Sequence, residues 1–233
     1  LIDVGGKKII HTGDFRDHGI AGERGTLEKV ITSYIGEVNI LLTEATLISR
    51  RDEVKWNPIQ SEEDLGRFAR NIFLENKENV ILVSSTNLDS IIEFYHALPW
   101  GMDFVCDAYQ AKLILIAMED KGKYYTKYRP EMIHGKPRTI YIVGDMEGLD
   151  LSKNCCRANF DILKKKGFAL LARETNPLFT NIVSKLSDPL IIYSKWCGYL
   201  EGENANPDLI KFIGNHKIVK VHSSGHAYVE TIE

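Results

Sequence analysis

The sequence lacks the features that mark membrane proteins and strongly basic proteins. Among its 233 residues no run approaches the roughly 20 consecutive apolar residues that a membrane helix needs, so we expect a soluble protein with no membrane partner. Lysine and arginine total 29 against 32 aspartate and glutamate residues, a formal net charge of −3. This balance excludes a global positive field that would attract nucleic acid, but it is compatible with a local phosphate pocket.

Cysteine is scarce as well. The four cysteines, Cys106, Cys155, Cys156 and Cys197, show no C-x-x-C spacing, and the two adjacent ones are awkward to bridge to each other. We therefore expect reduced thiols with packing roles, in a cytoplasmic protein. The composition, 44% hydrophobic and 26% charged, is that of a globular protein and excludes a disordered, collagen-like or coiled-coil chain.

Short apolar runs alternate with amphipathic stretches along the chain, which is typical of an α/β fold with a largely parallel sheet. The expected strands are residues 7–12, 38–44, 79–86, 102–107, 139–145, 168–173, 189–194 and 217–223. The expected helices are residues 61–78, 88–98, 108–120, 157–166 and 207–215. Ser61, followed by Asp64, predicts a capped start for the first of these helices. Polar, turn-rich stretches at 49–58, 122–138 and 197–207 are candidate boundaries or excursions.

Two acidic residues stand where predicted strands end. The run IIHTGD ends in Asp14, and the run VNILLTE ends in Glu44. Because α/β folds place their sites at the carboxyl ends of strands, Asp14 is a candidate ligand for a hard metal ion or a ribose. A turn or capping role for Asp14, and a plain structural pairing for Glu44, remain open alternatives.

The segment HSSGHA at residues 222–227 follows the last predicted strand. The small residues Ser223, Ser224 and Gly225 allow backbone N–H groups to converge on an oxyanion or phosphate. Histidine side chains can transfer protons near neutral pH, so His226 is a candidate acid or base, and a carboxylate such as Glu44 can fix its tautomer. We expect His222 to be structural.

Other polar residues carry weaker expectations. In HTGDFRDHG, His11 is expected on the opposite face of its strand from Asp14, His18 in a loop or supporting role, and Arg16 in an ion pair. Residues 84–87 are expected to cap a helix. The tryptophans Trp56, Trp100 and Trp196 are too scattered to define a platform on which bases stack.

Taken in order, TGDFR, LLTEAT and HSSGHA resemble three motifs of the metallo-β-lactamase fold hydrolases of the β-CASP group, which includes ribonuclease J, the cleavage-and-polyadenylation endonucleases and the Artemis-type DNA nucleases. The middle run VSSTNLDSIIEFYHA is similar to the β-CASP insertion of ribonuclease J-like proteins. The resemblance implies half of the αββα metallo-β-lactamase fold with an inserted β-CASP domain. Its expected domain limits are 1–58 for the first metallo-β-lactamase part, 59–189 for the β-CASP domain and 190–233 for the return.

The resemblance also implies roles for individual residues. Asp14 matches the aspartate that bridges two zinc ions, Glu44 the acid of motif A and His226 the histidine of motif B. It implies a zinc-dependent ribonuclease in which Glu44 and His226 are catalytic and Ser223, Ser224 and Gly225 contact phosphate. DNA stays open as a substrate, and so does a homodimer.

The chain departs from the family pattern in its metal ligands. The H-x-H-x-D-H motif that supplies most of them is absent, since no two of the seven histidines stand two residues apart. We therefore expect a piece of a longer polypeptide that starts before Leu1, with two zinc ions in the parent and none held tightly by this chain alone, which should be inactive.

Two further hypotheses remain. The chain would be a degenerate, non-catalytic nucleic-acid-binding or assembly subunit of the same fold if translation begins near Leu1. A generic nucleotide-binding α/β domain is disfavoured because the sequence has no G-x-G-x-x-G and no P-loop lysine.

Overall fold

The computed structural model describes residues 1–20, 26–50, 57–148 and 154–232, so Trp56 and the rest of 51–56 lie outside the described residues. The chain forms two compact units. The first unit comprises Leu1–Asp64 and Ser223–Glu233, and the second comprises Leu65–His222. These limits differ from the predicted ones, because residues 190–222, expected to return to the first domain, contribute two strands to the sheet of the second unit.

The second unit is built on a seven-stranded sheet in the order β12-β11-β4-β10-β5-β8-β9. Every neighbouring pair in this sheet is parallel, which confirms the predicted α/β class with a parallel sheet. The strands are β4 (Glu78–Val83), β5 (Asp103–Asp107), β8 (Ile140–Val143), β9 (Cys155–Arg157), β10 (Phe168–Ala172), β11 (Leu190–Ser194) and β12 (Ile218–Lys220). The neighbouring interior strands β11, β4 and β10 are almost entirely buried, as their continuous apolar runs predict.

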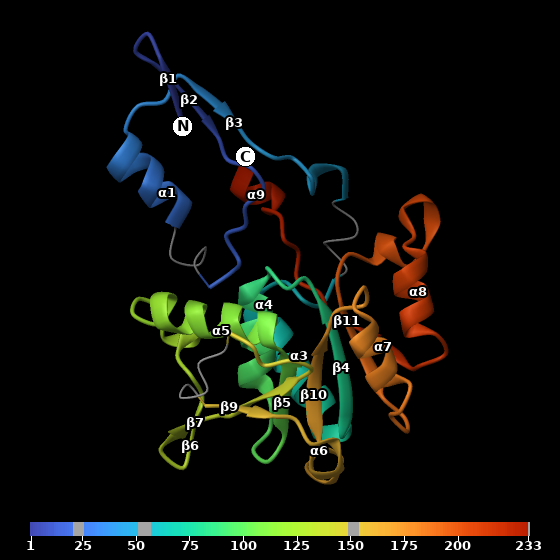
Figure 1. The fold of residues 1–233 in the computed structure, drawn as a ribbon. Helices are drawn as coiled ribbons and strands as arrows, with labels where there is room; N and C mark the ends of the chain where they lie inside the picture. Colours follow the sequence, from blue (N-terminus) through green and yellow to red (C-terminus); the bar gives the residue numbers. More distant parts are fainter. Residues whose placement is uncertain (21–25, 51–56, 149–153, 233) are drawn as a thin grey trace. The chain divides into compact units, whose positions relative to one another are not determined.

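Helices cover both faces of this sheet (Figure 1). The helices are α3 (Glu62–Glu75), α4 (Leu88–Ala97), α5 (Ala108–Lys121), α6 (Phe160–Lys166), α7 (Pro177–Val183) and α8 (Pro207–Ile213). On one face α6, α7 and α8 pack through Leu163, Phe179 and Phe212 against a core that includes Leu82 and Tyr193. The side chains of successive strand residues alternate between the two faces, which leaves the other face to α3, α4 and α5.

The helix starts follow from local hydrogen bonds. The side chain of Asn87 accepts a hydrogen bond from the Ser90 N–H and caps α4, as expected for residues 84–87. Asp107 and Gln110 form a reciprocal capping box at the start of α5. The Asp64 N–H donates to the Ser61 hydroxyl at 3.1 Å, which confirms the predicted cap of α3. The predicted excursion at 122–138 contains the short hairpin of β6 (Met132–Ile133) and β7 (Lys136–Pro137).

The first unit contains a three-stranded sheet. β2 (Lys7–His11) pairs antiparallel with β1 (Ile2–Val4) and parallel with β3 (Ile40–Leu42). It also contains α1 (Thr26–Val30), a π-helical turn (Ile31–Ile35), a short 3₁₀ turn (Ile48–Arg50) and α9 (Val229–Ile232).

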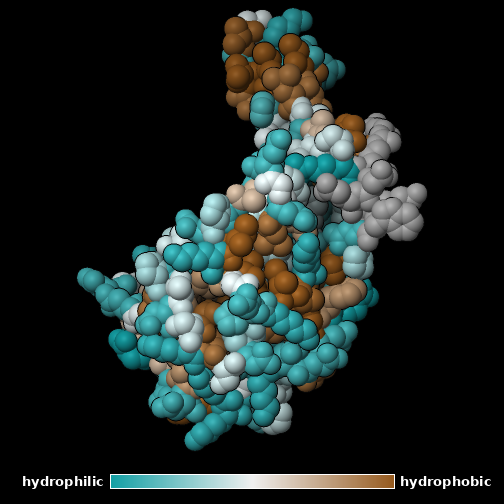
Figure 2. Space-filling model, turned by 90° about the vertical axis from the view of Figure 1, so that its right-hand side faces the viewer, coloured by the Kyte–Doolittle hydropathy of each residue, from teal (hydrophilic) through white to brown (hydrophobic). Residues whose placement is uncertain are grey.

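The sheet of the first unit exposes large apolar side chains. Every residue of β1 and β3 is exposed, and Figure 2 shows hydrophobic side chains gathered at the end of the view that carries these strands. The side chains concerned include Ile2, Val4, Ile40, Leu41 and Leu42. An exposed apolar patch of this kind usually marks a contact surface.

All four cysteines are free, as expected, and two of them, Cys106 and Cys155, are buried. Burial raises the pKa of the Cys106 thiol well above its usual value, which keeps that thiol protonated. Within the described ranges of the chain, no helix is long and apolar enough to cross a membrane.

The interior strand β4 should dominate the stability of the second unit. Leu82 on β4 is fully buried, whereas Leu74 near the end of α3 is 63% exposed. We predict that Leu82→Ala lowers the free energy of unfolding by about 2–5 kcal/mol through lost burial and a residual cavity. The matched control Leu74→Ala should change it by about 0.5 kcal/mol or less. Urea unfolding followed by circular dichroism measures both, and equal losses would contradict this packing.

Candidate active site

Asp14 and Glu44 lie together because of the strand pairing in the first unit. β2 and β3 run parallel, so both strands end at the same edge of the sheet. The Thr12 N–H extends the pairing by donating to the Leu42 carbonyl at 3.0 Å. Gly13 then takes a left-handed conformation with φ +63°, which turns the chain and places Asp14 beyond the end of β2.

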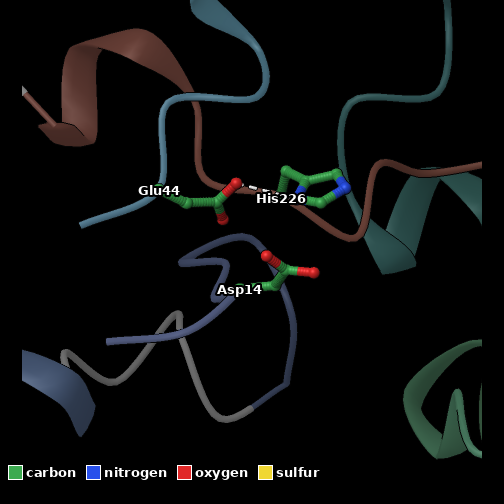
Figure 3. A group of neighbouring side chains, drawn as sticks. All are labelled: Asp14, Glu44 and His226. Atoms are coloured by element: carbon green, nitrogen blue, oxygen red, sulfur yellow. Dashed lines mark hydrogen bonds and ion pairs between the residues drawn. The ribbon is translucent and has the colours of Figure 1, made fainter. Parts of the chain in front are cut away.

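Glu44 is the centre of this site. Its carboxylate is 5% exposed, and its Oε1 accepts hydrogen bonds from the Phe15 N–H at 3.0 Å and the Ala227 N–H at 3.1 Å. Its Oε2 lies 2.7 Å from the Nδ1 atom of His226 (Figure 3). The predicted contact between Glu44 and His226 is therefore present, although the two residues are 182 positions apart in the sequence.

The charge state of Glu44 follows from these contacts. Burial raises the pKa of the Glu44 carboxyl, but the N–H groups of Phe15 and Ala227, the Thr46 hydroxyl and His226 together outweigh it, and the net pKa is lowered from the usual value of 4.5. Glu44 is thus ionised at neutral pH and can only accept hydrogen bonds. His226 must then carry its proton on Nδ1, which leaves Nε2 as the ring atom that can exchange a proton with a substrate.

Asp14 completes a cluster of three potential metal ligands. Asp14, Glu44 and His226 each offer one ligand atom, and these atoms lie within 4.8 Å of one another. Figure 3 shows the Asp14 carboxylate next to the Glu44–His226 pair, and Asp14 is exposed. Since both Glu44 oxygens are already hydrogen-bonded, Asp14 is the carboxylate of this group that best fits a metal ion. A closed zinc site takes four ligands, which these three residues cannot supply.

Glu62 ties the segment after Asp14 to the segment before His226. It is 1% exposed, forms an ion pair with Arg16, and accepts a hydrogen bond from the Ser223 hydroxyl at 2.6 Å. The ion pair predicted for Arg16 is confirmed. Arg16 also donates to the Ser224 carbonyl at 3.4 Å.

His18 supports the same loop. The ring of His18 is buried, its Nε2 lies 2.7 Å from the Ser224 carbonyl, and it stacks on Tyr228 at 4.3 Å. The Tyr228 hydroxyl in turn donates to the Gln60 carbonyl at 2.5 Å. The expected supporting role of His18 is confirmed, and the side chains of His18 and Arg16 both contact the Ser224 carbonyl of the His226 loop.

The three candidate phosphate contacts differ in how accessible they are. Ser223 is fully buried and its hydroxyl is bonded to Glu62, so its side chain does not reach a phosphate, contrary to the expectation from the sequence. The Ser224 hydroxyl accepts a hydrogen bond from the His226 N–H at 3.1 Å, and Gly225 is exposed. His11 accepts a hydrogen bond from the Gly13 N–H and shapes the turn.

Asp14, Glu44 and His226 were identified as site residues from the sequence, but Glu62 was not. It lies at the start of a predicted helix among the acidic residues SEED, where a negative charge complements the helix dipole, so nothing singled it out. The sequence feature that could have indicated Glu62 is Arg16, because an arginine close to a site often needs an acidic partner.

The comparisons with known proteins address the fold alone. No family model matches the sequence, and no curated protein matches it. The crystal structure of a protein of unknown function from Enterococcus faecalis V583 is similar, with a TM-score of 0.63 and 20% sequence identity. The match covers 96% of this chain and 48% of that protein, so the chain spans about half its length.

The charge of Glu44 should make this site sensitive to acid. The stabilisation from its lowered pKa is present above the usual value of 4.5 and is lost as the pH falls through the folded value. We predict that the carboxyl carbon of Glu44, followed by nuclear magnetic resonance, titrates below 4.5, and that Phe15 and Ala227 amides lose protection from exchange in the same range. Glu44→Gln should abolish this acid-dependent loss, whereas the exposed Glu37→Gln should retain it. A Glu44 titration above 4.5 would contradict the geometry.

Removal of Glu62 should loosen the His226 loop. Glu62→Ala leaves Arg16 and the buried Ser223 hydroxyl without their carboxylate, and we expect a loss of about 3 kcal/mol in the stability of the first unit. Hydrogen exchange at the Phe15 and Ala227 amides measures it. The matched control Glu63→Ala removes the exposed neighbour on the same helix and should cost well under about 1 kcal/mol. Equal effects of the two variants would exclude a positioning role for Glu62.

Proposed function

We propose that this chain is part of a zinc-dependent metallo-β-lactamase/β-CASP nuclease that hydrolyses RNA phosphodiesters. The observation that carries the proposal is the Glu44–His226 hydrogen bond beside Asp14, formed by the three residues whose motifs resemble that family. The first unit would belong to the metallo-β-lactamase domain and most of the second unit to the β-CASP domain.

The residues of this chain would perform the acid–base part of the reaction. Glu44 holds His226 by Nδ1, so Nε2 of His226 can donate a proton to the oxygen that leaves phosphorus. The negative charge of the Glu44 carboxylate would also stabilise the imidazole ring of His226 in its protonated form. The Ser224 hydroxyl, hydrogen-bonded to the His226 N–H, and the exposed Gly225 are the groups that would lie along the phosphate.

Asp14 would hold the metal ions of the parent protein. When bound, zinc ions lower the pKa of a coordinated water and so supply a hydroxide nucleophile near neutral pH. The remaining ligands would have to come from elsewhere in a longer polypeptide. The exposed apolar side chains of β1 and β3 support that view, since further chain could bury them.

A second candidate function is a non-catalytic nucleic-acid-binding or assembly subunit of the same fold. The specific observation in its favour is that, of the two carboxylates in the cluster, Glu44 is already hydrogen-bonded through both oxygens. Asp14 alone of the two is then left to bind a metal ion, and one carboxylate does not make a zinc site. The coding sequence upstream of Leu1 separates the two proposals. An H-x-H-x-D-H motif within about 150 residues supports the enzyme, and a start codon beside Leu1 supports the binding subunit.

Substitution of His226 and substitution of Asp14 in the parent protein should have different effects on zinc binding and on RNA cleavage. We predict that His226→Ala lowers the rate of RNA cleavage by about 10²–10⁴-fold but leaves most zinc bound, because it removes a proton donor. Asp14→Ala should lower both zinc content and cleavage, because it removes a ligand. Elemental analysis and cleavage of a labelled RNA measure the two effects, with His216→Ala as the histidine control. Normal cleavage by His226→Ala would refute the role of His226.

A further inference from the structure

The second unit contains a cavity of about 330 Å³ that is separate from the residues discussed above. Its lining includes Arg70 of α3, His96 of α4, Trp100 of the following loop, and Glu131, His134 and Arg138 around the β6–β7 hairpin. The volume lies at the lower end of the range of about 300–1,000 Å³ that is typical of small-molecule sites.

Arg138 lies in the lining of the cavity and anchors the loop that carries Trp100. It is 6% exposed, and its guanidinium donates to the backbone carbonyls of Leu98 at 3.0 Å and Met102 at 2.9 Å. These contacts span the loop that carries Trp100 and hold both of its ends. The loop is therefore fixed by a buried cation rather than by burial of its own tryptophan.

The rings of Trp100 and His134 lie at the cavity, and each residue has an uncommon feature. Trp100 is 72% exposed, although tryptophan is normally among the more buried residues, and its ring meets that of His134 at 5.1 Å. His134 occupies the tip of the hairpin with φ +49°, a conformation that is uncommon for residues other than glycine. An exposed tryptophan offers a planar base a surface on which to stack.

The charges at the cavity favour an anion. Arg70, Arg138 and Glu131 line the cavity, and the Glu131 carboxylate is already 3.1 Å from the Nδ1 atom of His96. The Nε2 atom of His96 and the Nε atom of Arg138 are buried and make no hydrogen bond within the part of the chain that the structure describes. Both nitrogens are closed to solvent, so an anion in the cavity would approach Arg70 instead, whose side chain is exposed.

We propose that this cavity binds a nucleotide, with its base against Trp100 and its phosphate toward Arg70. The nucleotide would be a free nucleoside monophosphate or one unit of a single-stranded RNA. The RNA source rests on the proposed function, whereas the free nucleotide does not. Neither source requires Asp14, Glu44 or His226, so the site can be tested independently of hydrolysis.

The test is a titration of the 233-residue chain with adenosine monophosphate in the presence of EDTA, followed by isothermal calorimetry. We expect saturable binding that Arg70→Ala weakens about tenfold, through a lost contact to a charged phosphate, and that Trp100→Ala weakens by a similar factor. Both side chains are exposed, so both variants should keep the circular dichroism spectrum of the parent chain. The controls are Arg67→Ala, an exposed arginine on the same helix, and Tyr124→Ala, an exposed ring elsewhere.

Two further ligands define the chemistry and the source. Inorganic phosphate and adenosine should each bind more weakly than adenosine monophosphate, since each offers one of the two contacts. Hexaadenylate that binds more tightly than the mononucleotide assigns the site to RNA, and equal affinity assigns it to a free nucleotide. The proposal is overturned if adenosine monophosphate fails to bind at millimolar concentration, if phosphate alone binds as tightly, or if Arg70→Ala and Trp100→Ala match their controls.

Discussion

The buried carboxylate of Glu44 is the interaction on which the candidate active site depends. It accepts hydrogen bonds from Phe15 and Ala227 and holds His226, so one side chain joins segments that lie 29 and 182 positions away in the sequence. An ionised carboxylate that is 5% exposed would be costly without such donors. The same contacts that offset its burial also orient the imidazole, so stability and chemistry rest on the same hydrogen bonds.

Strand pairing and buried side chains of the first unit position the residues around Glu44. The parallel pairing of β2 with β3 delivers Asp14 and Glu44 to one edge. Glu62 and His18 fix the loop before His226 through Ser223 and the Ser224 carbonyl. The first arrangement comes from backbone hydrogen bonds and the second from buried side chains. In the acid–base role that we propose for it, His226 would lose little freedom when a substrate binds, which favours catalysis.

Much of the fold and the three groups of the site could be predicted from the sequence, for identifiable reasons. Continuous apolar runs such as residues 79–83 indicate buried parallel strands, and capping residues such as Ser61 and Asn87 mark helix starts. β9 and α7 were not predicted, because β9 (CCR) has no apolar run and α7 (PLFTNIV) is rich in residues of low helix propensity. The second domain limit and Glu62 were also missed, since strand pairing across long sequence distances and buried ion pairs leave no local pattern.

The central claim is that Asp14 lies at a metal centre served by the Glu44–His226 pair. Anomalous diffraction at the zinc absorption edge, from crystals of the longest natural polypeptide that contains this chain, tests it most directly. The account predicts zinc bound to the Asp14 carboxylate, with Glu44 still hydrogen-bonded to Nδ1 of His226 and the imidazole free of metal. Zinc bound by His226 with none at Asp14, or no zinc at this site in a complete polypeptide, would contradict it.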